Sequence, residues 1–271
     1  NRRAVYRDFG FDEIYFQSDF TDVDYIREYI SDQSDYEELI RLYESKEEGE
    51  PLFVFNVTMQ NHSAYNGAWT NLDKEVWLTG ELEGRFNTVD QYLNLICRSD
   101  RALQYLVEYF SQVEEPTMIL LFGDHQPQVA TNFYTEVMGG EFEDLPAQVQ
   151  QTKQEVPFLI WANYDIPEAS GIQLSLNYLS SLLLKAAGLP RTGYQHFLEE
   201  LHAAVPVVNA VGFQDGEGEW YKDREDMPQA AQEALTAYEM LQYAQFFGKE
   251  GEELEDFFQA EDSGCDVLCV E

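Results

Sequence analysis

The segment TMILLFGDHQP, residues 117–127, decides the fold class predicted for this chain. Residues 117–122 form a nearly continuous apolar run with the length of a buried strand, and Gly123 permits a tight turn at its end. Asp124 and His125 then place a carboxylate oxygen beside an imidazole nitrogen. Because ligands of open α/β sheets bind beyond the carboxyl ends of strands, this pair is a candidate half-site for a divalent metal. The alternative is that Asp124 caps the turn and His125 is simply exposed.

Two further apolar runs, LFVFNVTM at residues 52–59 and VPFLIW at residues 156–161, also predict buried strands. Segments with helical spacing of apolar residues alternate with these runs, and the alternation predicts an α/β fold in which helices cover a sheet. Helices are expected from Ser34, where a capping box begins, from about Asn87 to Gln112, from about Ser175 to Ala187, and from Pro228 to Gly248.

Composition limits the classes of function. The chain has 271 residues, 44% of them hydrophobic, and can bury a full core. Sixteen basic and 51 acidic residues give a net charge of −35, which repels nucleic acid, so no nucleic-acid partner is expected. Residues 1–250 carry the periodic segments of one domain, whereas residues 251–271 form an acidic tail without clear periodicity.

Other histidines and the cysteines are weaker signals. His62 follows the apolar run at residues 52–59 together with Gln60 and Asn61, so three hydrogen-bonding side chains gather where a substrate oxygen could lie. By itself, such a histidine is more often a loop residue than a catalytic one. We interpret His196 and His202 as structural residues and Cys97 as a core residue. The two cysteines of the tail, Cys265 and Cys269, are interpreted as idle thiols.

Several stretches together resemble the lipoteichoic-acid-synthase-like sulfatase family, within the alkaline phosphatase and sulfatase superfamily. The two most specific stretches are FNVTMQNH at residues 55–62 and LFGDHQP at residues 121–127. Weaker similarity is carried by NRRAVY at 1–6 with GFD at 10–12, VPFLIWAN at 156–163, LNYL at 176–179 and AGLP at 187–190. The resemblance covers roughly residues 1 to 250. It implies an alkaline-phosphatase-like mixed sheet flanked by helices, of which this chain is the carboxy-terminal portion.

The resemblance also implies an activity and a set of roles. Family members transfer glycerol phosphate from phosphatidylglycerol on the outer face of the bacterial cytoplasmic membrane, with a threonine nucleophile and one divalent metal. That metal is commonly manganese, with magnesium or zinc as alternatives. By position in the motifs, Asp124 and His125 resemble metal ligands, and His62 resembles a substrate-binding histidine. Arg2 resembles the arginine that holds the substrate phosphate, which suits the paired donors of a guanidinium.

One departure from the family pattern matters for activity. The family's threonine nucleophile and acidic metal ligand lie upstream of the stretch that matches Asn1, and nothing in this sequence replaces them. Two protein ligands rarely hold a divalent ion firmly. We therefore expect the chain alone to be inactive and to bind metal weakly or not at all. Its expected partners are the upstream half of the same domain and a phospholipid or glycerol-phosphate substrate.

Two other functions stay open at this point. A sulfatase or phosphoethanolamine transferase shares the fold and the metal half-site, although a sulfatase needs a Cys or Ser in a Cys/Ser-x-Pro-x-Arg context, and no cysteine here stands in one. A truncated, non-catalytic binding module is the third reading. An exposed apolar surface where the upstream half would pack would indicate an enzyme fragment, whereas a covered surface would indicate a binding module.

Overall fold

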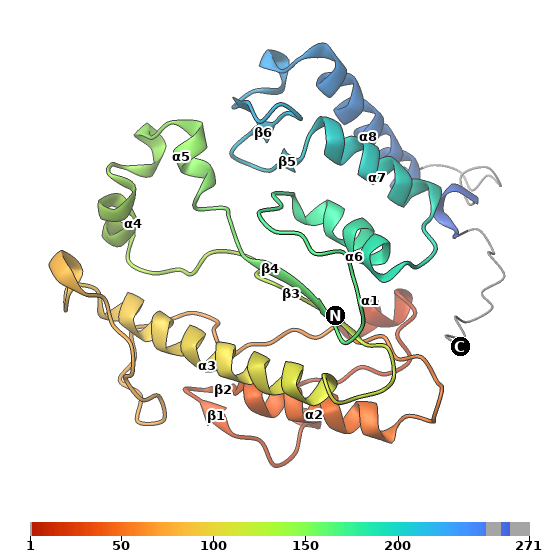
Figure 1. The fold of residues 1–271 in the computed structure, drawn as a ribbon. Helices are drawn as coiled ribbons and strands as arrows, with labels where there is room; N and C mark the ends of the chain where they lie inside the picture. The colour runs from red at the N-terminus through yellow and green to blue at the C-terminus, as the bar shows by residue number, and fades with distance from the viewer. Residues whose placement is uncertain (1, 248–255, 261–271) are drawn as a thin grey trace. The chain divides into compact units, whose positions relative to one another are not determined.

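The computed structural model describes residues 2–247 and 256–260, and it divides into two compact units. Unit 1 comprises Asn1–Glu114 and Pro127–Val137, and unit 2 comprises Glu115–Gln126 and Met138–Glu271. The colours in Figure 1 follow the chain through both units. Cys265 and Cys269 lie outside the described residues, as do residues 251–255 and 261–271 of the expected acidic tail.

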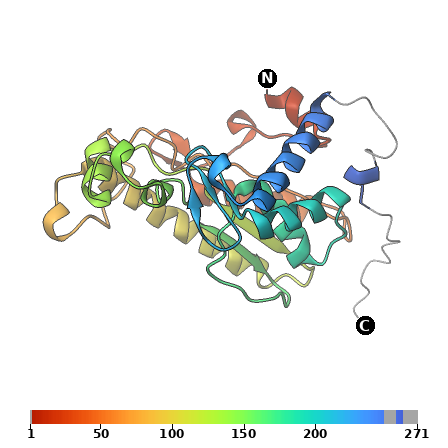
Figure 2. The same cartoon turned by 90° about the horizontal axis from the view of Figure 1, so that it is seen from above.

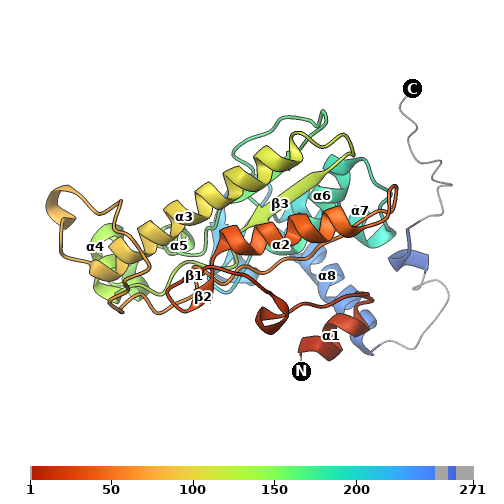
Figure 3. The same cartoon turned by 90° about the horizontal axis from the view of Figure 1, so that it is seen from below.

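Unit 1 is built on two helices that pack together. The long helix α3 buries Leu95 completely, with Leu106 and Phe110 on the same face, and Figure 3 shows α2 running alongside it. Asp100, which interrupts the apolar stripe of α3, is exposed to solvent. The elements of unit 1 are α1 (Arg2–Asp8), β1 (Tyr25–Ile26), β2 (Tyr29–Ile30), α2 (Asp32–Ser45), α3 (Asn87–Phe110) and, except for its last residue, α4 (Thr131–Met138).

Helix α2 begins three residues before the expected start. Ser31, not Ser34, is its N-cap, and the Ser31 hydroxyl accepts a hydrogen bond from the Ser34 backbone nitrogen. The Ser34 hydroxyl instead accepts from the backbone nitrogen of Asp24, 3.0 Å away. Both serines are good capping residues, and the long-range bond to Asp24 decides between them.

Unit 2 contains the antiparallel pair β3 and β4, whose register places Leu120 opposite Ile160. Helices α6, α7 and α8 pack in sequence order, and Figure 2 shows α7 and α8 from above. A left-handed Gly188 ends α6, as the sequence predicts. The elements are β3 (Met118–Phe122), α5 (Ala147–Gln151), β4 (Phe158–Ala162), α6 (Leu179–Ala187), α7 (Gly193–Ala204), β5 (Val207–Val208), β6 (Phe213–Gln214), β7 (Trp220–Tyr221) and α8 (Gln229–Phe247).

Two small apolar clusters form the core of unit 2. One comprises Val205, Met227, Ala231 and Leu235, and the other comprises Tyr178, Leu198 and Leu201. The short described part of the tail contacts the start of α7: Ala260 forms an isolated β-bridge with Thr192, and the ring centroids of Phe258 and Tyr194 are 5.1 Å apart.

The prediction of a strand at residues 52–59 is wrong. Leu52–Met59 is not a strand, and several of its apolar side chains are exposed, including Phe53 at 72% and Val57 at 50%. Within the described part of the chain, no backbone hydrogen bond involves residues 52–58. An apolar run shows that a segment can pair, but a strand forms only where a neighbouring strand supplies hydrogen-bond partners. The α/β class itself is confirmed, with small sheets.

Candidate functional site

The turn after β3 places Asp124 and His125 together in unit 2. The Gly123 nitrogen donates to the Pro157 carbonyl at 3.1 Å, and a Cβ on Gly123 would lie 3.0 Å from the Val156 Cβ, so glycine suits this close approach. Asp124 Oδ1 accepts from the His125 backbone nitrogen at 2.8 Å. Asp124 Oδ2 lies 3.3 Å from His125 Nε2, and both side chains are largely exposed.

The pair matches a divalent metal in the kind of its donors but not in their number. A carboxylate oxygen and an imidazole nitrogen suit Mn²⁺ or Zn²⁺, but a firm site needs more protein ligands than two. Within residues 2–247 and 256–260, no group of three or more His, Cys, Asp or Glu side chains could hold a metal ion. Asp124 and His125 by themselves therefore do not make a firm metal site.

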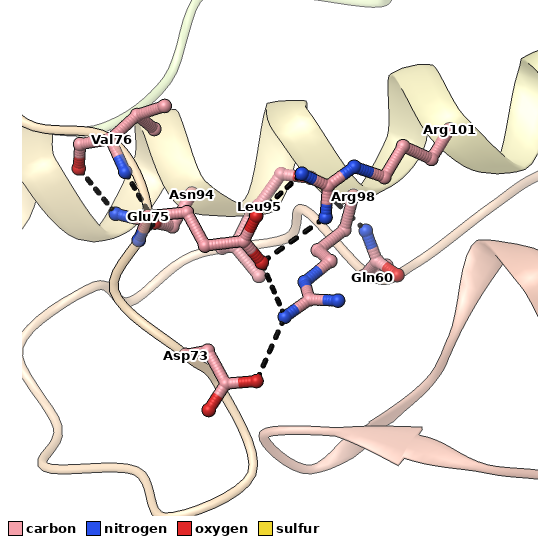
Figure 4. A network of polar contacts seen from close by, with 8 residues as sticks. All are labelled: Gln60, Asp73, Glu75, Val76, Asn94, Leu95, Arg98 and Arg101. Carbon is pink, nitrogen blue, oxygen red and sulfur yellow. Dashed lines mark hydrogen bonds and ion pairs between the residues drawn. The ribbon is translucent and has the colours of Figure 1, made fainter.

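Gln60 anchors the loop that carries His62 in unit 1. Only 1% of Gln60 is exposed, and its Oε1 accepts from the Asp32 backbone nitrogen at 3.0 Å. Its Nε2 donates to the Leu95 carbonyl at 3.2 Å and to Ser99 Oγ at 3.1 Å. Figure 4 shows Gln60 beside Leu95 on α3. This buried amide joins the loop to α2 and α3, a role that the sequence alone did not indicate.

A second anchor of the same loop is Arg27, which sequence analysis missed. Its side chain is buried and donates to three carbonyl oxygens: Gln60 and His62, each at 2.6 Å, and Ala64 at 2.8 Å. The guanidinium also lies over the ring of Tyr65, 5.5 Å from the centroid. Because an isolated arginine normally indicates an exposed side chain, no local signal could have identified this contact.

His62 itself is exposed at the tip of this loop. Its backbone nitrogen donates to the Met59 carbonyl at 3.0 Å, which closes a turn. His62 Nδ1 lies 2.9 Å from the Ser63 carbonyl oxygen and 3.1 Å from the Tyr29 hydroxyl, and the rings of Tyr29 and His62 are 5.6 Å apart. The imidazole is therefore held on one edge, while the histidine stays accessible to a ligand.

Beneath the loop lies a carboxyl group with a perturbed acidity. Asp32 is 2% exposed, and burial raises its pKa to about 6, although hydrogen bonds from Ser99 and the backbone contact with Gln60 oppose the shift. One of its oxygens, Oδ1, is buried without a hydrogen-bond partner among the described residues. Asp32 is the first residue of α2, and its backbone nitrogen binds the loop through Gln60.

Two of the four predicted site residues lie in each unit. Arg2 is the first residue of α1 and is exposed; it belongs to unit 1 with His62, and no contact between the two is recorded among the described residues. Asp124 and His125, in unit 2, do contact one another. His196 is exposed, and the ring of His202 lies 5.2 Å from that of Tyr178.

The sulfatase family profile matches residues 1–189, and the chain belongs to this family. The fold resembles that of "Streptococcus pyogenes phosphoglycerol transferase GacH in complex with sn-glycerol-1-phosphate", with a TM-score of 0.70 over 96% of this chain at 17% sequence identity. The expected resemblance and fold are thereby confirmed.

Two curated proteins of Rhizobium meliloti (strain 1021) are also similar. One, named "Putative cyclic beta-1,2-glucan modification protein", is 28% identical over 254 residues, or 92% of this chain. The other, "Capsular polysaccharide biosynthesis protein RkpI", is 28% identical over 99 residues, which are 36% of this chain and 16% of that protein. The chain spans 39% of the length of the first relative and 62% of the solved structure.

No helix in the described ranges combines the length and the apolar composition required to span a membrane.

Proposed function

We propose that this chain forms part of a metal-dependent enzyme that transfers or hydrolyses phosphate esters, with glycerol phosphate from a phospholipid as the substrate group. The observation that carries the proposal is the Asp124–His125 turn at the end of β3, within a chain of the sulfatase family. The similarity to a phosphoglycerol transferase and to two proteins named for glucan or capsular polysaccharide supports a cell-envelope substrate. The proposed location is the outer face of a bacterial cytoplasmic membrane.

The proposed roles follow the chemistry of the side chains. Asp124 and His125 would contribute two ligands to a divalent metal, manganese first and magnesium or zinc as alternatives, which when bound polarises a phosphoryl oxygen. Arg2 would offer two parallel N–H donors to the phosphate, and His62 would donate to or accept from a substrate oxygen. The nucleophile and the remaining metal ligand are proposed to come from an upstream half of the same domain.

A comparison of the natural gene product with this chain tests the proposal. The mass of that product is measured first, and both proteins are then assayed with phosphatidylglycerol and with a chromogenic phosphodiester. We expect a longer product whose turnover requires manganese and is lost in Asp124→Ala, and no turnover by the present chain. Turnover by the present chain alone would contradict the division of the site between two halves. A natural product no longer than this chain, without turnover, would contradict the enzyme proposal itself.

Two alternatives keep specific support. A sulfatase or phosphoethanolamine transferase would share the Asp124–His125 turn, but a sulfatase nucleophile cannot be Cys97, which lies within α3 and not at a strand end. A non-catalytic binding module is favoured by the two-ligand limit at Asp124 and His125 among the described residues. Hydrolysis of an aryl sulfate by the natural product would favour a sulfatase. If the natural product binds metal no better than its Asp124→Ala variant does, a non-catalytic binding module is favoured.

A further inference from the structure

The contacts of His62 converge on one nitrogen of its ring. Nδ1 has two oxygens within hydrogen-bonding distance, the Ser63 carbonyl at 2.9 Å and the Tyr29 hydroxyl at 3.1 Å. The Tyr29 hydroxyl also lies 3.3 Å from the same Ser63 carbonyl. No hydrogen bond of Nε2 is recorded within the described ranges. The three groups form a small triangle on one edge of the imidazole.

Of the two neutral forms of the imidazole, only one satisfies this triangle. A carbonyl oxygen can only accept, so the short contact between Nδ1 and Ser63 requires a proton on Nδ1. The Tyr29 hydroxyl can then donate to the Ser63 carbonyl while its oxygen faces the Nδ1–H group. If the hydroxyl donated to an unprotonated Nδ1, two lone pairs would face one another at 2.9 Å between Nδ1 and the Ser63 oxygen.

Arg27 binds the backbone on both sides of the Ser63 carbonyl. Its guanidinium binds the carbonyl oxygens of His62 and Ala64, the residues on either side of Ser63, at 2.6 and 2.8 Å. The same guanidinium lies over the ring of Tyr29, with 5.3 Å between the guanidinium carbon and the ring centroid. Arg27 therefore contacts both flanks of the Ser63 peptide and the ring that bears the second oxygen.

We propose that Arg27 and Tyr29 are positioning residues that hold the proton of neutral His62 on Nδ1 and so leave Nε2 as the nitrogen that meets a ligand. In this state Nε2 carries a lone pair and can accept a proton or a hydrogen bond; after protonation it donates to an oxyanion such as phosphate. The proposal deepens the proposed function, because it names the atom of His62 that acts on a substrate oxygen, and it rests on that function only for the identity of the ligand.

The ring nitrogens can be observed directly. The full chain, labelled with ¹⁵N-histidine, is studied by long-range ¹H–¹⁵N correlation at alkaline pH, where imidazoles are neutral. His62→Gln identifies the His62 signals among the four histidines. We expect a protonated Nδ1 and an unprotonated Nε2 in the wild type. Tyr29→Phe preserves the aromatic ring and should reduce the Nδ1–H population by about twofold or more, because one of two oxygens facing Nδ1 is lost.

Arg27→Lys tests the second part of the proposal, since lysine retains the charge but cannot bind three carbonyls in one plane. We expect Arg27→Lys to shift His62 toward the Nε2–H form; if this variant does not fold by circular dichroism, Tyr29→Phe decides alone. A wild type with Nε2–H overturns the proposal, and so does an Nδ1–H form that persists unchanged in the folded variants. Added inorganic phosphate then tests the proposed function separately: no shift of Nε2 would count against phosphate as the ligand and not against the proton assignment.

Discussion

At the scale of single residues, the buried carboxyl of Asp32 links the stability of unit 1 to pH. Its pKa is about 6 in the folded chain and 3.8 in the reference state, and it is raised because burial disfavours the charged form. A raised folded pKa stabilises the fold below the reference pKa, and this stabilisation is lost as pH rises through about 6. The maximum effect is about 3 kcal/mol, of which roughly 1 kcal/mol is lost between pH 5 and pH 8.

We therefore predict that Asp32→Asn removes roughly 1 kcal/mol of the stability difference between pH 5 and pH 8, measured by urea unfolding. Asp100→Asn, which removes the same charge from an exposed position of α3, is the matched control and should leave the difference unchanged. If both variants had equal effects, the pH dependence would come from the net charge of the chain and not from burial of Asp32.

Metal binding at Asp124 and His125, which follow the end of β3, can also be tested at the scale of single residues. Because the β3 turn offers only two side chains of a kind that binds metals, Asp124 and His125, we expect the isolated chain to bind Mn²⁺ only weakly in calorimetry, with a Kd of about 1 mM or higher. Asp124→Ala should abolish this weak binding. The control Asp165→Ala removes an exposed carboxylate elsewhere in unit 2 and should retain it.

Tight binding by the isolated chain would show that the pair recruits ligands that the described residues do not supply. Equal loss of Mn²⁺ binding in Asp124→Ala and Asp165→Ala would indicate general attraction of the cation to an acidic surface.

At the scale of elements, one amide joins the segment at residues 73–76 to α3. Asn94 is 3% exposed; its Oδ1 accepts from the Val76 nitrogen at 3.1 Å, and its Nδ2 donates to the Val76 carbonyl at 2.7 Å. Arg101 contacts the same segment through an exposed ion pair with Glu75. Figure 4 shows both kinds of contact along the helix.

We predict that Asn94→Ala costs about 2–4 kcal/mol of unfolding free energy, because partly buried backbone groups of the segment lose their partners. Arg101→Ala should have a much smaller effect, since exposed ion pairs contribute little and are screened by salt. Urea titrations at low and high salt measure both. A larger loss in Arg101→Ala than in Asn94→Ala would show that charge pairing and not the buried amide holds the segment.

At the scale of the whole molecule, the exposed apolar run at Leu52–Met59 should govern association. Exposed apolar side chains and an unpaired backbone favour pairing with another chain. We predict that the isolated chain self-associates with rising concentration in light scattering and that Val57→Lys suppresses this. The control is Val137→Lys, which introduces the same charge at a valine of the same exposure, since Val57 and Val137 are each 50% exposed. Val137→Lys should not suppress the self-association. Equal suppression by both would show that added charge alone prevents association.

Several features of this chain could be read from its sequence. The apolar runs that became β3 and β4, the helical spacing of α3, the glycine that ends α6 and the Gly123 turn depend on neighbours in sequence, and local patterns predicted them. The sulfatase-family resemblance rested on motifs of the same local kind. The roles of Arg2, His62, Asp124 and His125, and the division at residue 250, stay predictions.

Other features were decided by the tertiary structure alone. Arg27 and Gln60 are buried because residues distant in sequence supply their partners, as Ala64 does for Arg27 and Leu95 for Gln60. Residues 52–59 have the composition of a strand, but no neighbouring strand pairs with them within the described residues. Hydrophobic periodicity reports what one segment could bury, whereas burial and hydrogen bonding depend on which other segment arrives beside it, and that is a property of the folded chain.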